Sequence, residues 1–480
     1  MAVKNFLFVG GDVSGIQKFI YNISSKKAAV SLKGRSAYLS QYTQEVCDRI
    51  KNLPSSQSAQ NYECIYCSGG KFYIILSDSP QARKELSSLS VDVENELWKK
   101  QHGQLGIALG ILPFSTDEVS SIMDISKVYV EGKDYGIGEL WRRMTMLFNA
   151  AKSRKFSDLL LQEYNSFFDV IPVGESPRVC AITGLESDQC IYLDSDKDGN
   201  GIMVLPEVKE QVELGQKLRR EENFKTFEEY ADGSKLGVLR MDVDFLGRRF
   251  IQGFNSFKEY SLFSGRLGRF FSNTVREVQR NDFFCDNVNI IYAGGDDLFA
   301  VGKWDKVIDF AQEVHDRFAL EFEADGLSIS GGMSINSPKF PISKAAQRSG
   351  DAEEMAKEHR DSDGNVKNAF CFFGESVSWK KDFPIIKALK DDFVREITDH
   401  ALSRGILQRM MQYAEVAVKG EDMSYQWQAV YYLSRMLERC PKDSRDFVKH
   451  LRDSELTKGI DNYRLIALAC RWAELSTRFN

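Results

Sequence analysis

The sequence has no apolar run that approaches the roughly 18 residues needed to cross a membrane. The apolar stretch after Met1 is also too short for the hydrophobic region of a secretory signal. Positive charge is not in surplus, because the formal net charge is −6, so any contact with nucleic acid must use local basic patches or partner subunits. We therefore expect a cytoplasmic protein without a membrane partner.

Histidine is scarce, and the cysteines do not form the two pairs of a zinc site. The five histidines are scattered, so the His315-Asp316 dipeptide lacks the further histidines of a metal-dependent phosphohydrolase, and we interpret it as structural. Nine cysteines, an odd number, fit a reducing compartment better than a disulfide framework. Cys64 and Cys67 have no second pair at the distance of a zinc site, and alternation on a half-buried strand explains them more simply. Structural zinc is not expected.

The segment 288–301 predicts a β-hairpin, because two apolar runs flank a Gly-Gly-Asp-Asp turn. Gly294 and Gly295 let the backbone turn sharply and leave room for a ligand beside it. Asp296 and Asp297 repel each other, which makes sense if a hard divalent cation lies between them and a phosphate. A solvated surface turn is the alternative for this tetrapeptide alone.

Two stretches share the order strand-helix-strand-strand-helix-strand, which is the order of a ferredoxin-like sheet. Asp12 precedes Gly69 by 57 residues, and Asp242 precedes Gly294 by 52, which indicates an internal repeat. Gly-Gly-Lys at 69–71 replaces the acidic turn in the first copy. The first copy is expected to have strands at 6–9, 62–67, 72–76 and 105–111, and helices at about 37–50, after a basic small-residue patch, and 81–100.

The fold class expected is α+β, with two ferredoxin-like palm domains, a small mixed linker domain and a helical bundle. A chain of 480 residues suits three or four units of about 100–150 residues each. Apolar residues recur at helical spacing toward the end of the chain, where only two prolines occur. The expected boundaries are 1–150 for the first palm, 151–225 for the linker, 226–380 for the second palm and 381–480 for the bundle.

Asp242 ends the first strand of the second copy and supplies a third carboxylate. We expect that strand to lie centrally, beside the strand that enters the hairpin, so that Asp242 converges with Asp296 and Asp297 around a Mg²⁺ pair. Asp244 alternates onto the same face and is a further candidate outside this group. An acidic strand edge that faces solvent is the alternative. Lys357, on a later helix, is either a phosphate contact or an ordinary solvated lysine.

Several separated motifs resemble one known family, the CRISPR polymerases, which are the large subunits of type III effector complexes. The first palm of this family is resembled at two motifs, Gly-Asp-Val-Ser-Gly-Ile-Gln at 11–17 and Ser-Leu-Lys-Gly-Arg-Ser at 31–36. The sequence of the first motif is closer to the subtype III-A version than to the III-B version. The second palm is resembled by residues 239–247, the 293–297 turn and Ala356-Lys357. The resemblance covers roughly 1–380, and the helical tail fits by position.

The resemblance implies that ATP binds between the two palms and is joined into cyclic oligoadenylate when the complex holds a matching target RNA. It implies a small subunit, a subunit that binds the guide-RNA 5′ tag, backbone subunits, CRISPR RNA and target RNA as partners. Mg²⁺ or Mn²⁺ would be the cofactor. Mapped by motif, the metal ligands and catalytic acids would be Asp242, Asp296 and Asp297, and the nucleotide contacts would be Ser14, Gly15, Gly294, Gly295 and Lys357.

Two features depart from the family pattern. The first-palm motifs begin at the start of this sequence, with no histidine-aspartate nuclease domain before them, so we expect no DNase activity from this chain. The family's four-cysteine zinc site is represented only by Cys180 and Cys190. The hairpin alone would also fit a diguanylate-cyclase-like enzyme that makes a cyclic dinucleotide, and a non-catalytic scaffold is the third hypothesis.

Overall fold

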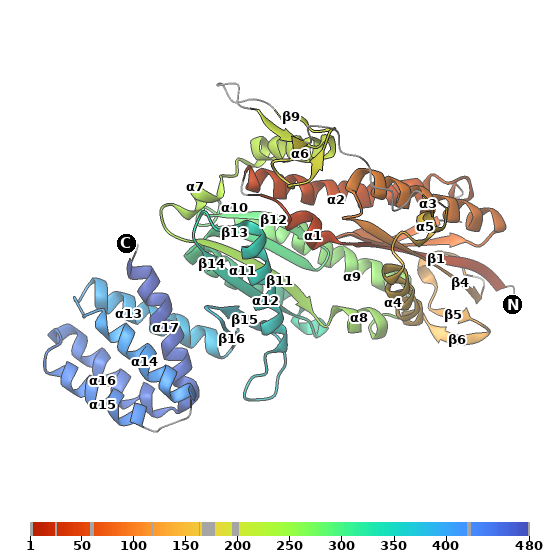
Figure 1. The fold of residues 1–480 in the computed structure, drawn as a ribbon. Helices are drawn as coiled ribbons and strands as arrows, with labels where there is room; N and C mark the ends of the chain where they lie inside the picture. Colours follow the sequence, from red (N-terminus) through yellow and green to blue (C-terminus); the bar gives the residue numbers. More distant parts are fainter. Residues whose placement is uncertain are drawn as a thin grey trace. The chain divides into compact units, whose positions relative to one another are not determined.

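The computed structural model describes residues 3–24, 26–57, 62–117, 119–162, 164–165, 178–193, 201–419 and 424–478 (Figure 1). Contacts divide the chain into two compact units, Met1–Ser328 with Asn336–Gln347, and Ile329–Ile335 with Arg348–Asn480. None of the described helices combines the length and apolar character needed to cross a bilayer. The four domain boundaries expected from the sequence stay predictions.

The first sheet of unit 1 has the strand order β2-β3-β1-β4-β5-β6. Each strand that pairs with a neighbour does so in the antiparallel sense. Its first four strands have the ferredoxin-like arrangement expected from the sequence, and the β5–β6 hairpin extends the sheet at one edge. The strands are β1 (Val3–Ser14), β2 (Tyr62–Ser68), β3 (Lys71–Ser77), β4 (Gly106–Asp117), β5 (Lys127–Val130) and β6 (Lys133–Gly136).

The helix expected from about residue 37 begins earlier and includes part of the basic small-residue patch that was expected to precede it. Helix α2 spans Ala28–Lys51, so the Ser-Leu-Lys-Gly-Arg-Ser motif lies inside it and is buried. Arg35 donates to the carbonyl of Phe19 at 2.5 Å and to Oε1 of Gln211 at 3.0 Å. Lys33 donates to the carbonyl of Ile290 at 2.5 Å. Both cations therefore have structural partners within the fold.

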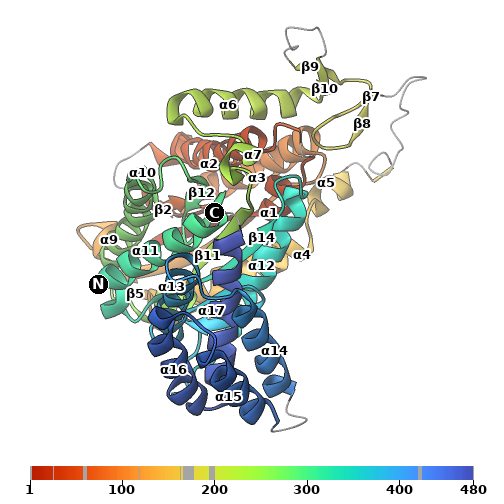
Figure 2. The ribbon, with the colours of Figure 1, turned by 90° about the vertical axis from the view of Figure 1, so that its left-hand side faces the viewer.

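Helix α6 (Pro206–Glu222) of the linker region packs on α2, as Figures 1 and 2 show. Glycines allow this close approach: a Cβ at Gly34 would lie 1.8 Å from the carbonyl oxygen of Gln211, and one at Gly215 would lie 2.0 Å from that of Val30. The linker's other elements are short: α5 (Ser157–Gln162), β7 (Arg178–Val179), β8 (Glu186–Ser187), β9 (Ile191–Leu193) and β10 (Ile202–Val204).

The second copy has the expected element order along the chain, and in unit 1 its strands are ordered β12-β13-β11. The prediction that the first strand lies beside the strand that enters the hairpin is wrong, because β11 pairs with β13, the strand that leaves the hairpin. The hairpin's other arm, β12, pairs with β13 and so lies one strand away from β11. The elements are β11 (Leu236–Asp244), α8 (Leu246–Gln252), α9 (Phe257–Arg269), a π-helical turn (Phe270–Thr274), α10 (Val275–Arg280), β12 (Val288–Gly294), β13 (Asp297–Lys303), α11 (Trp304–Phe322) and β14 (Ser328–Asn336).

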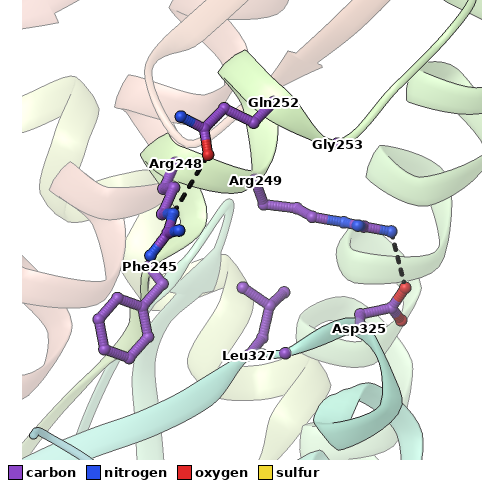
Figure 3. Close-up of a pocket in the computed structure, with 8 residues that line it drawn as sticks. Phe245, Arg248, Arg249, Gln252, Gly253, Asp325 and Leu327 are labelled. Carbon is purple, nitrogen blue, oxygen red and sulfur yellow. Dashed lines mark hydrogen bonds and ion pairs between the residues drawn. The ribbon is translucent and has the colours of Figure 1, made fainter.

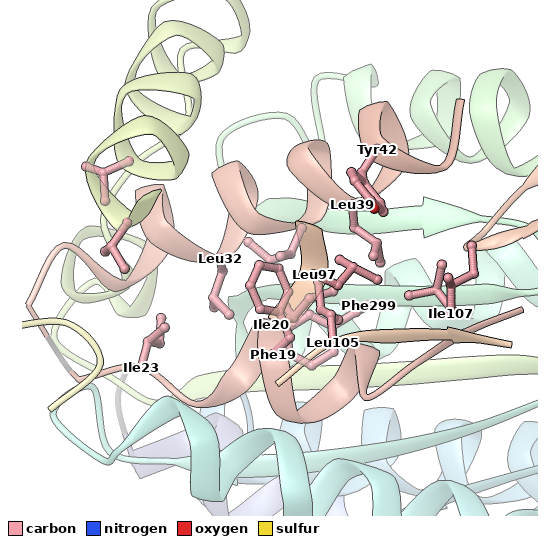
Figure 4. Close-up of a cluster of buried hydrophobic side chains, with 14 of the residues drawn as sticks. Phe19, Ile20, Ile23, Leu32, Leu39, Tyr42, Leu97, Leu105, Ile107 and Phe299 are labelled. Carbon is pink, nitrogen blue, oxygen red and sulfur yellow. The ribbon is translucent and has the colours of Figure 1, made fainter. Parts of the chain in front are cut away.

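The two copies share their cores within unit 1. Helix α2 of the first copy contacts β12 of the second, and α9 of the second contacts β2 of the first. One shared cluster places Phe299 of β13 among side chains of α2 and its neighbours (Figure 4). In the other, Tyr260 of α9 stacks on Trp141 of α4 (Gly138–Ser153) with ring centroids 4.2 Å apart. This reciprocal packing holds the two copies' turns in a defined relation.

Unit 2 joins a small set of strands to helices. Strand β14 pairs in parallel with β15 (Ala369–Phe372), and β15 pairs antiparallel with β16 (Glu375–Ser378). Phe372 of β15 packs against Trp472 of the last helix, with ring centroids 5.6 Å apart. The helical region predicted from 381 onward is present (Figure 2), as α13 (Asp382–Thr398), α14 (Gly405–Lys419), α15 (Ser424–Leu437), α16 (Arg445–Asp453) and α17 (Ile460–Arg478).

Candidate metal and nucleotide site

The turn between β12 and β13 and the end of β11 bring three carboxylates together. Asp242 and Asp297 are directly opposed in the β11–β13 register. The amide of Val243 donates to the carbonyl of Asp296 at 3.2 Å, which ties the turn to the end of the strand. One carboxylate oxygen from each of Asp242, Asp296 and Asp297 lies within 4.8 Å of the others. The sequence-based convergence of these three residues is thus observed.

This cluster suits a hard divalent cation. All three ligands are carboxylate oxygens, which Mg²⁺ and Mn²⁺ prefer, and the three side chains are half-buried, so solvent and a ligand can reach them. Among the described residues it is the one group of three or more histidine, cysteine or acidic side chains with metal-ligand spacing. Asp244 lies outside the group: it is buried and accepts a hydrogen bond from Ser328 Oγ at 2.8 Å.

The first copy repeats this backbone with different side chains. Asp12 opposes Lys71 in the β1–β3 register, as Asp242 opposes Asp297 in the second copy. The amide of Val13 donates to the carbonyl of Gly70 at 2.8 Å, which matches the bond from Val243 to the acidic turn. Lys71 therefore occupies the position in the first copy that a carboxylate occupies in the second.

The turns of the two copies meet. A Cβ built on Gly69 would lie 3.2 Å from the Cα of Gly295, and one built on Gly295 would lie 3.4 Å from the Cα of Gly69. Both residues have positive φ, +61° and +68°, a conformation that favours glycine. The Gly-Gly-Lys and Gly-Gly-Asp-Asp turns thus share one site.

Lys71 faces the carboxylates across this contact. Burial acts to lower the pKa of Lys71, but the surrounding carboxylates outweigh burial and raise the pKa, so the side chain is a cation. Asp12, one of them, also forms an ion pair with Lys152 at 2.7 Å. The carboxylates that raise the pKa are, in decreasing order, Asp296, Asp12, Asp297 and Asp242. The sequence shows that Lys71 stands where the second copy has an acid, but it does not show that Lys71 lies beside the acids of the second copy.

Two tyrosines border the acidic turn and were missed from the sequence. Burial, followed by the charges of Asp297 and Asp296, raises the pKa of Tyr292, whose hydroxyl donates to the carbonyl of Gly294 at 3.0 Å. Burial and the charge of Asp296 likewise raise the pKa of Tyr66. Both phenols therefore stay protonated. A strand tyrosine resembles any core aromatic in sequence, so no sequence signal separates these two from packing residues.

Ser14 and Gly15 lie at the end of β1, where α1 (Ile16–Tyr21) begins. The hydroxyl of Ser14 donates to the carbonyl of Gly106 at 3.2 Å. Gly15 has a φ of +86°, and a Cβ there would lie 2.2 Å from the carbonyl oxygen of Gln104, so glycine is required. Phe245, the N-cap residue of α8, has the same left-handed conformation as Gly15 at the N-cap of α1, with a φ of +63°, which extends the duplication.

Lys357 is placed in unit 2, on α12 (Ile342–Glu358), with its Nζ 2.9 Å from Glu353 Oε1. Its contact with a phosphate stays a prediction. His315 lies buried on α11 with Nδ1 3.0 Å from Asp316 Oδ1, which agrees with a structural role. Cys67, on β2, has its Sγ 2.8 Å from that of Cys47.

A pocket of about 330 Å³ lies beside the turn that follows β11 (Figure 3). Arg249 donates to Oδ1 of Asp325 at 3.0 Å, and Arg248 donates to Oε1 of Gln252 at 3.2 Å. The lining residues of the pocket are Phe245, Arg248, Arg249, Gln252, Gly253, Asp325, Gly326 and Leu327. The pocket is therefore lined by residues other than the three clustered acids.

Two family models match the chain. Residues 5–169 match "Csm1 subunit domain B", and residues 235–369 match "Cas10/Cmr2, second palm domain". The chain is 26% identical to a protein of Mycobacterium tuberculosis named CRISPR system single-strand-specific deoxyribonuclease Cas10/Csm1 (subtype III-A), over 90% of this chain and 62% of that protein. A Streptococcus thermophilus protein of the same name is also 26% identical, over 93% of this chain and 64% of its own length. The chain thus spans less than two thirds of these relatives.

Solved structures share the fold. A Csm1–Csm4 cassette in complex with pppApApA has a TM-score of 0.67 at 18% identity, over 99% of this chain and 70% of that one. The cassette in complex with cA4 has the same TM-score, identity and coverage. The apo cassette has a TM-score of 0.65 at 19% identity, over 98% and 70% of the two chains.

Proposed function

This chain is a homologue of the Cas10/Csm1 proteins of subtype III-A CRISPR systems, and from that premise we propose that it is a Mg²⁺-dependent nucleotidyltransferase that makes cyclic oligoadenylate from ATP. The observation that carries the proposal is the cluster of Asp242, Asp296 and Asp297 within 4.8 Å, opposite the Gly-Gly-Lys turn. The cA4 and nucleotide complexes of the structurally similar cassettes support the class of ligand.

In this proposal the 3′-hydroxyl of one ATP attacks the α-phosphorus of the next, a P–O bond forms, and pyrophosphate leaves with the electrons of the broken bond. Asp242, Asp296 and Asp297 would hold Mg²⁺ or Mn²⁺, which would favour loss of the hydroxyl proton and offset charge on the phosphate. Lys71, which lies in the first palm, would contact a phosphate of the nucleotide as a point charge. Gly69 and Gly295 keep the two turns close enough to act on the same pair of nucleotides.

The mapped nucleotide contacts remain part of the proposal. Ser14 ends β1 and Gly15 caps the start of α1, so we propose that these two residues contact nucleotide from the first palm. Gly294 and Gly295 are proposed to contact it from the acidic turn. Lys357 is proposed as a phosphate contact. The partners proposed are a Csm4-like subunit, a small subunit, backbone subunits, CRISPR RNA and target RNA, in the cytoplasm. The proposal contains no DNase step for this chain.

The test is product identification by mass spectrometry, with the purified chain and with its assembled complex, each with ATP and Mg²⁺ and with or without target RNA. We expect linear and cyclic oligoadenylates that increase with target RNA and are lost in the Asp296→Ala, Asp297→Ala double variant. Unchanged yield in that variant would show that the carboxylate assignment is wrong. A cyclic dinucleotide from GTP alone would favour the diguanylate-cyclase-like alternative, and failure to bind Mn²⁺ and ATP in calorimetry would favour the scaffold.

A further inference from the structure

A buried lysine connects helix α2 of the first copy to the strand that enters the acidic turn of the second copy. Lys33 is only 5% exposed, and its Nζ donates to the carbonyl of Ile290 on β12 at 2.5 Å. The same Nζ lies 2.6 Å from Oε2 of Glu222, the last residue of α6. Oε1 of Glu222 lies 3.0 Å from Nη1 of Arg276 on α10. Lys33 therefore joins α2, α6 and β12 at one point.

The charges of this group depend on one another. Burial acts to raise the pKa of Glu222, but the charge and hydrogen bond of Lys33, followed by those of Arg276, outweigh burial and lower the pKa. Burial lowers the pKa of Lys33, and the charge of Glu222 opposes this effect. Because a buried ion pair is seldom more stabilising than apolar side chains of similar size, stability alone is a weak reason for a lysine here.

The carbonyl that Lys33 binds belongs to a β-bulge. The β12–β13 register shifts between Ile290 and Tyr292, where β12 has one extra residue relative to β13. A bulge interrupts the ladder, bends the strand and increases its twist. Beyond this bulge β12 runs directly into Gly294 and the acidic turn. Lys33 thus holds the strand at the place where its direction toward the turn is set.

The first copy has the same bulge, and a tyrosine follows it in both copies. The β2–β3 register shifts between Cys64 and Tyr66. A Cβ built on Gly69 would lie 3.2 Å from the hydroxyl of Tyr292. One built on Gly295 would lie 3.3 Å from the hydroxyl of Tyr66. Each bulge therefore directs a tyrosine onto the turn of the other copy, at the contact between the two turns.

We propose that Lys33 is a positioning residue for the acidic turn: it holds the bulge of β12, ties it to α6 through Glu222, and thereby sets where the three clustered carboxylates lie. Lys33 itself does not touch the substrate in this proposal. The chemical role of the carboxylates rests on the proposed function, whereas the hold on β12 does not, so the experiment measures the two separately.

The experiment compares the parent chain with Lys33→Met and with the double variant Lys33→Met, Glu222→Gln. The double variant removes both charges of the pair, so neither stays buried without its partner, and it tests the proposal if the single variant fails to fold. Thermal unfolding shows which variants fold.

Arg35→Met is the matched control. Arg35 is also a buried cation of α2, at 1% exposure. Within the described part of the chain, its recorded hydrogen bonds go to α1, to Asn22 at the end of α1 and to Gln211 of α6, and none goes to the second copy. The control variant should therefore lose stability without an effect on the acidic turn.

The first measurement is hydrogen exchange by mass spectrometry on peptides that cover 288–297, the end of β12 with the acidic turn. Loss of a charge-assisted hydrogen bond should make exchange in this segment about tenfold faster in both Lys33 variants and leave it unchanged in Arg35→Met. The second measurement is Mn²⁺ affinity by electron paramagnetic resonance without ATP. It should fall about tenfold in the Lys33 variants, the lower end of what residues that support metal ligands contribute.

Unchanged exchange at 288–297 in the folded double variant would overturn the proposal, and so would an equal increase in Arg35→Met. Faster exchange with the Mn²⁺ affinity of the parent would also overturn it, because Lys33 would then only stabilise the strand. A parent chain that binds Mn²⁺ but makes no oligoadenylate would contradict the proposed function and leave the positioning role supported. If the parent chain binds no Mn²⁺, the proposed function fails, and exchange alone decides whether Lys33 holds the turn.

Discussion

Replacing Gly69 by alanine should separate the two turns of the candidate site. Gly69 has a φ of +61°, so an alanine pays about 1–2 kcal/mol for the left-handed conformation. Its Cβ would also lie 3.2 Å from the Cα of Gly295 and 3.2 Å from the hydroxyl of Tyr292, so the acidic turn must move by a few tenths of an ångström. A misplacement of 1 Å can cost about a hundredfold in rate, so we expect roughly a tenfold loss for this smaller shift.

Gly132→Ala is the matched control, because Gly132 has a φ of +76° and a Cβ there would meet no atom within 4 Å. Both variants should unfold at a slightly lower temperature for the same backbone reason. Only Gly69→Ala should slow oligoadenylate formation, measured by chromatography in the complex with target RNA at saturating Mg²⁺. Equal rates for the two variants would refute the idea that contact between the turns sets the geometry of the site.

Three further predictions concern charge. Asp242→Asn should lower turnover by more than about a hundredfold and weaken Mn²⁺ binding without loss of thermal stability, since loss of residues that only support metal ligands already costs about 10–100-fold in metal affinity or activity. Asp244→Asn removes a buried hydrogen-bond acceptor and should mainly lower the unfolding temperature. The opposite result for the two variants would show that Asp244, and not Asp242, is the metal ligand. Lys71→Met should tighten Mn²⁺ binding about tenfold in the absence of nucleotide, because a cation beside the carboxylates is removed, and it should slow turnover. Unchanged metal affinity in calorimetry would show that Lys71 lies away from the ion. The pKa of His102 is raised above 6.5, and the hydrogen bond to Glu207 is the largest cause. The stabilisation that this pair gives to the folded state is therefore complete below about pH 6.5 and is lost as pH rises through the raised pKa of His102. At this half-exposed pair the effect should be under about 1 kcal/mol, and a chemical-denaturation difference between pH 6 and pH 8 that persists in His102→Gln would contradict it.

Local signals in the sequence were sufficient for the hairpin and for the order of elements. The Gly-Gly-Asp-Asp turn between two apolar runs is a β12–β13 turn in the structure, and Asp242 ends a strand as expected. The βαββαβ order of the first copy is also found in the structure, with the expected pairing of its strands. These features depend on residues near one another in the chain, where turn chemistry and apolar periodicity act directly.

The errors have a common cause. The helix was expected to begin only after the basic small-residue patch, but α2 includes Lys33 and Arg35 of that patch, and α6 packs on this part of α2 and supplies one partner of Arg35. The neighbour of β11 was misplaced because both hairpin strands carry similar apolar runs, and only pairing across the sheet separates them. Propensity and periodicity contain no information on which distant segment covers a helix or joins a strand.

Patterns along the chain were enough to identify the chemical groups of the candidate site: a third acid at Asp242, an acidic turn, and a Gly-Gly-Lys copy of that turn. The place of Lys71 among those acids could not be found in this way, because it depends on the close approach of Gly69 and Gly295, which lie on the turns of two different sheets. Helix α2 packs on β12 and α9 packs on β2, so this contact is held by segments that lie far apart in the sequence. A pattern local to the chain predicts a turn; the packing of two sheets decides what the turn faces.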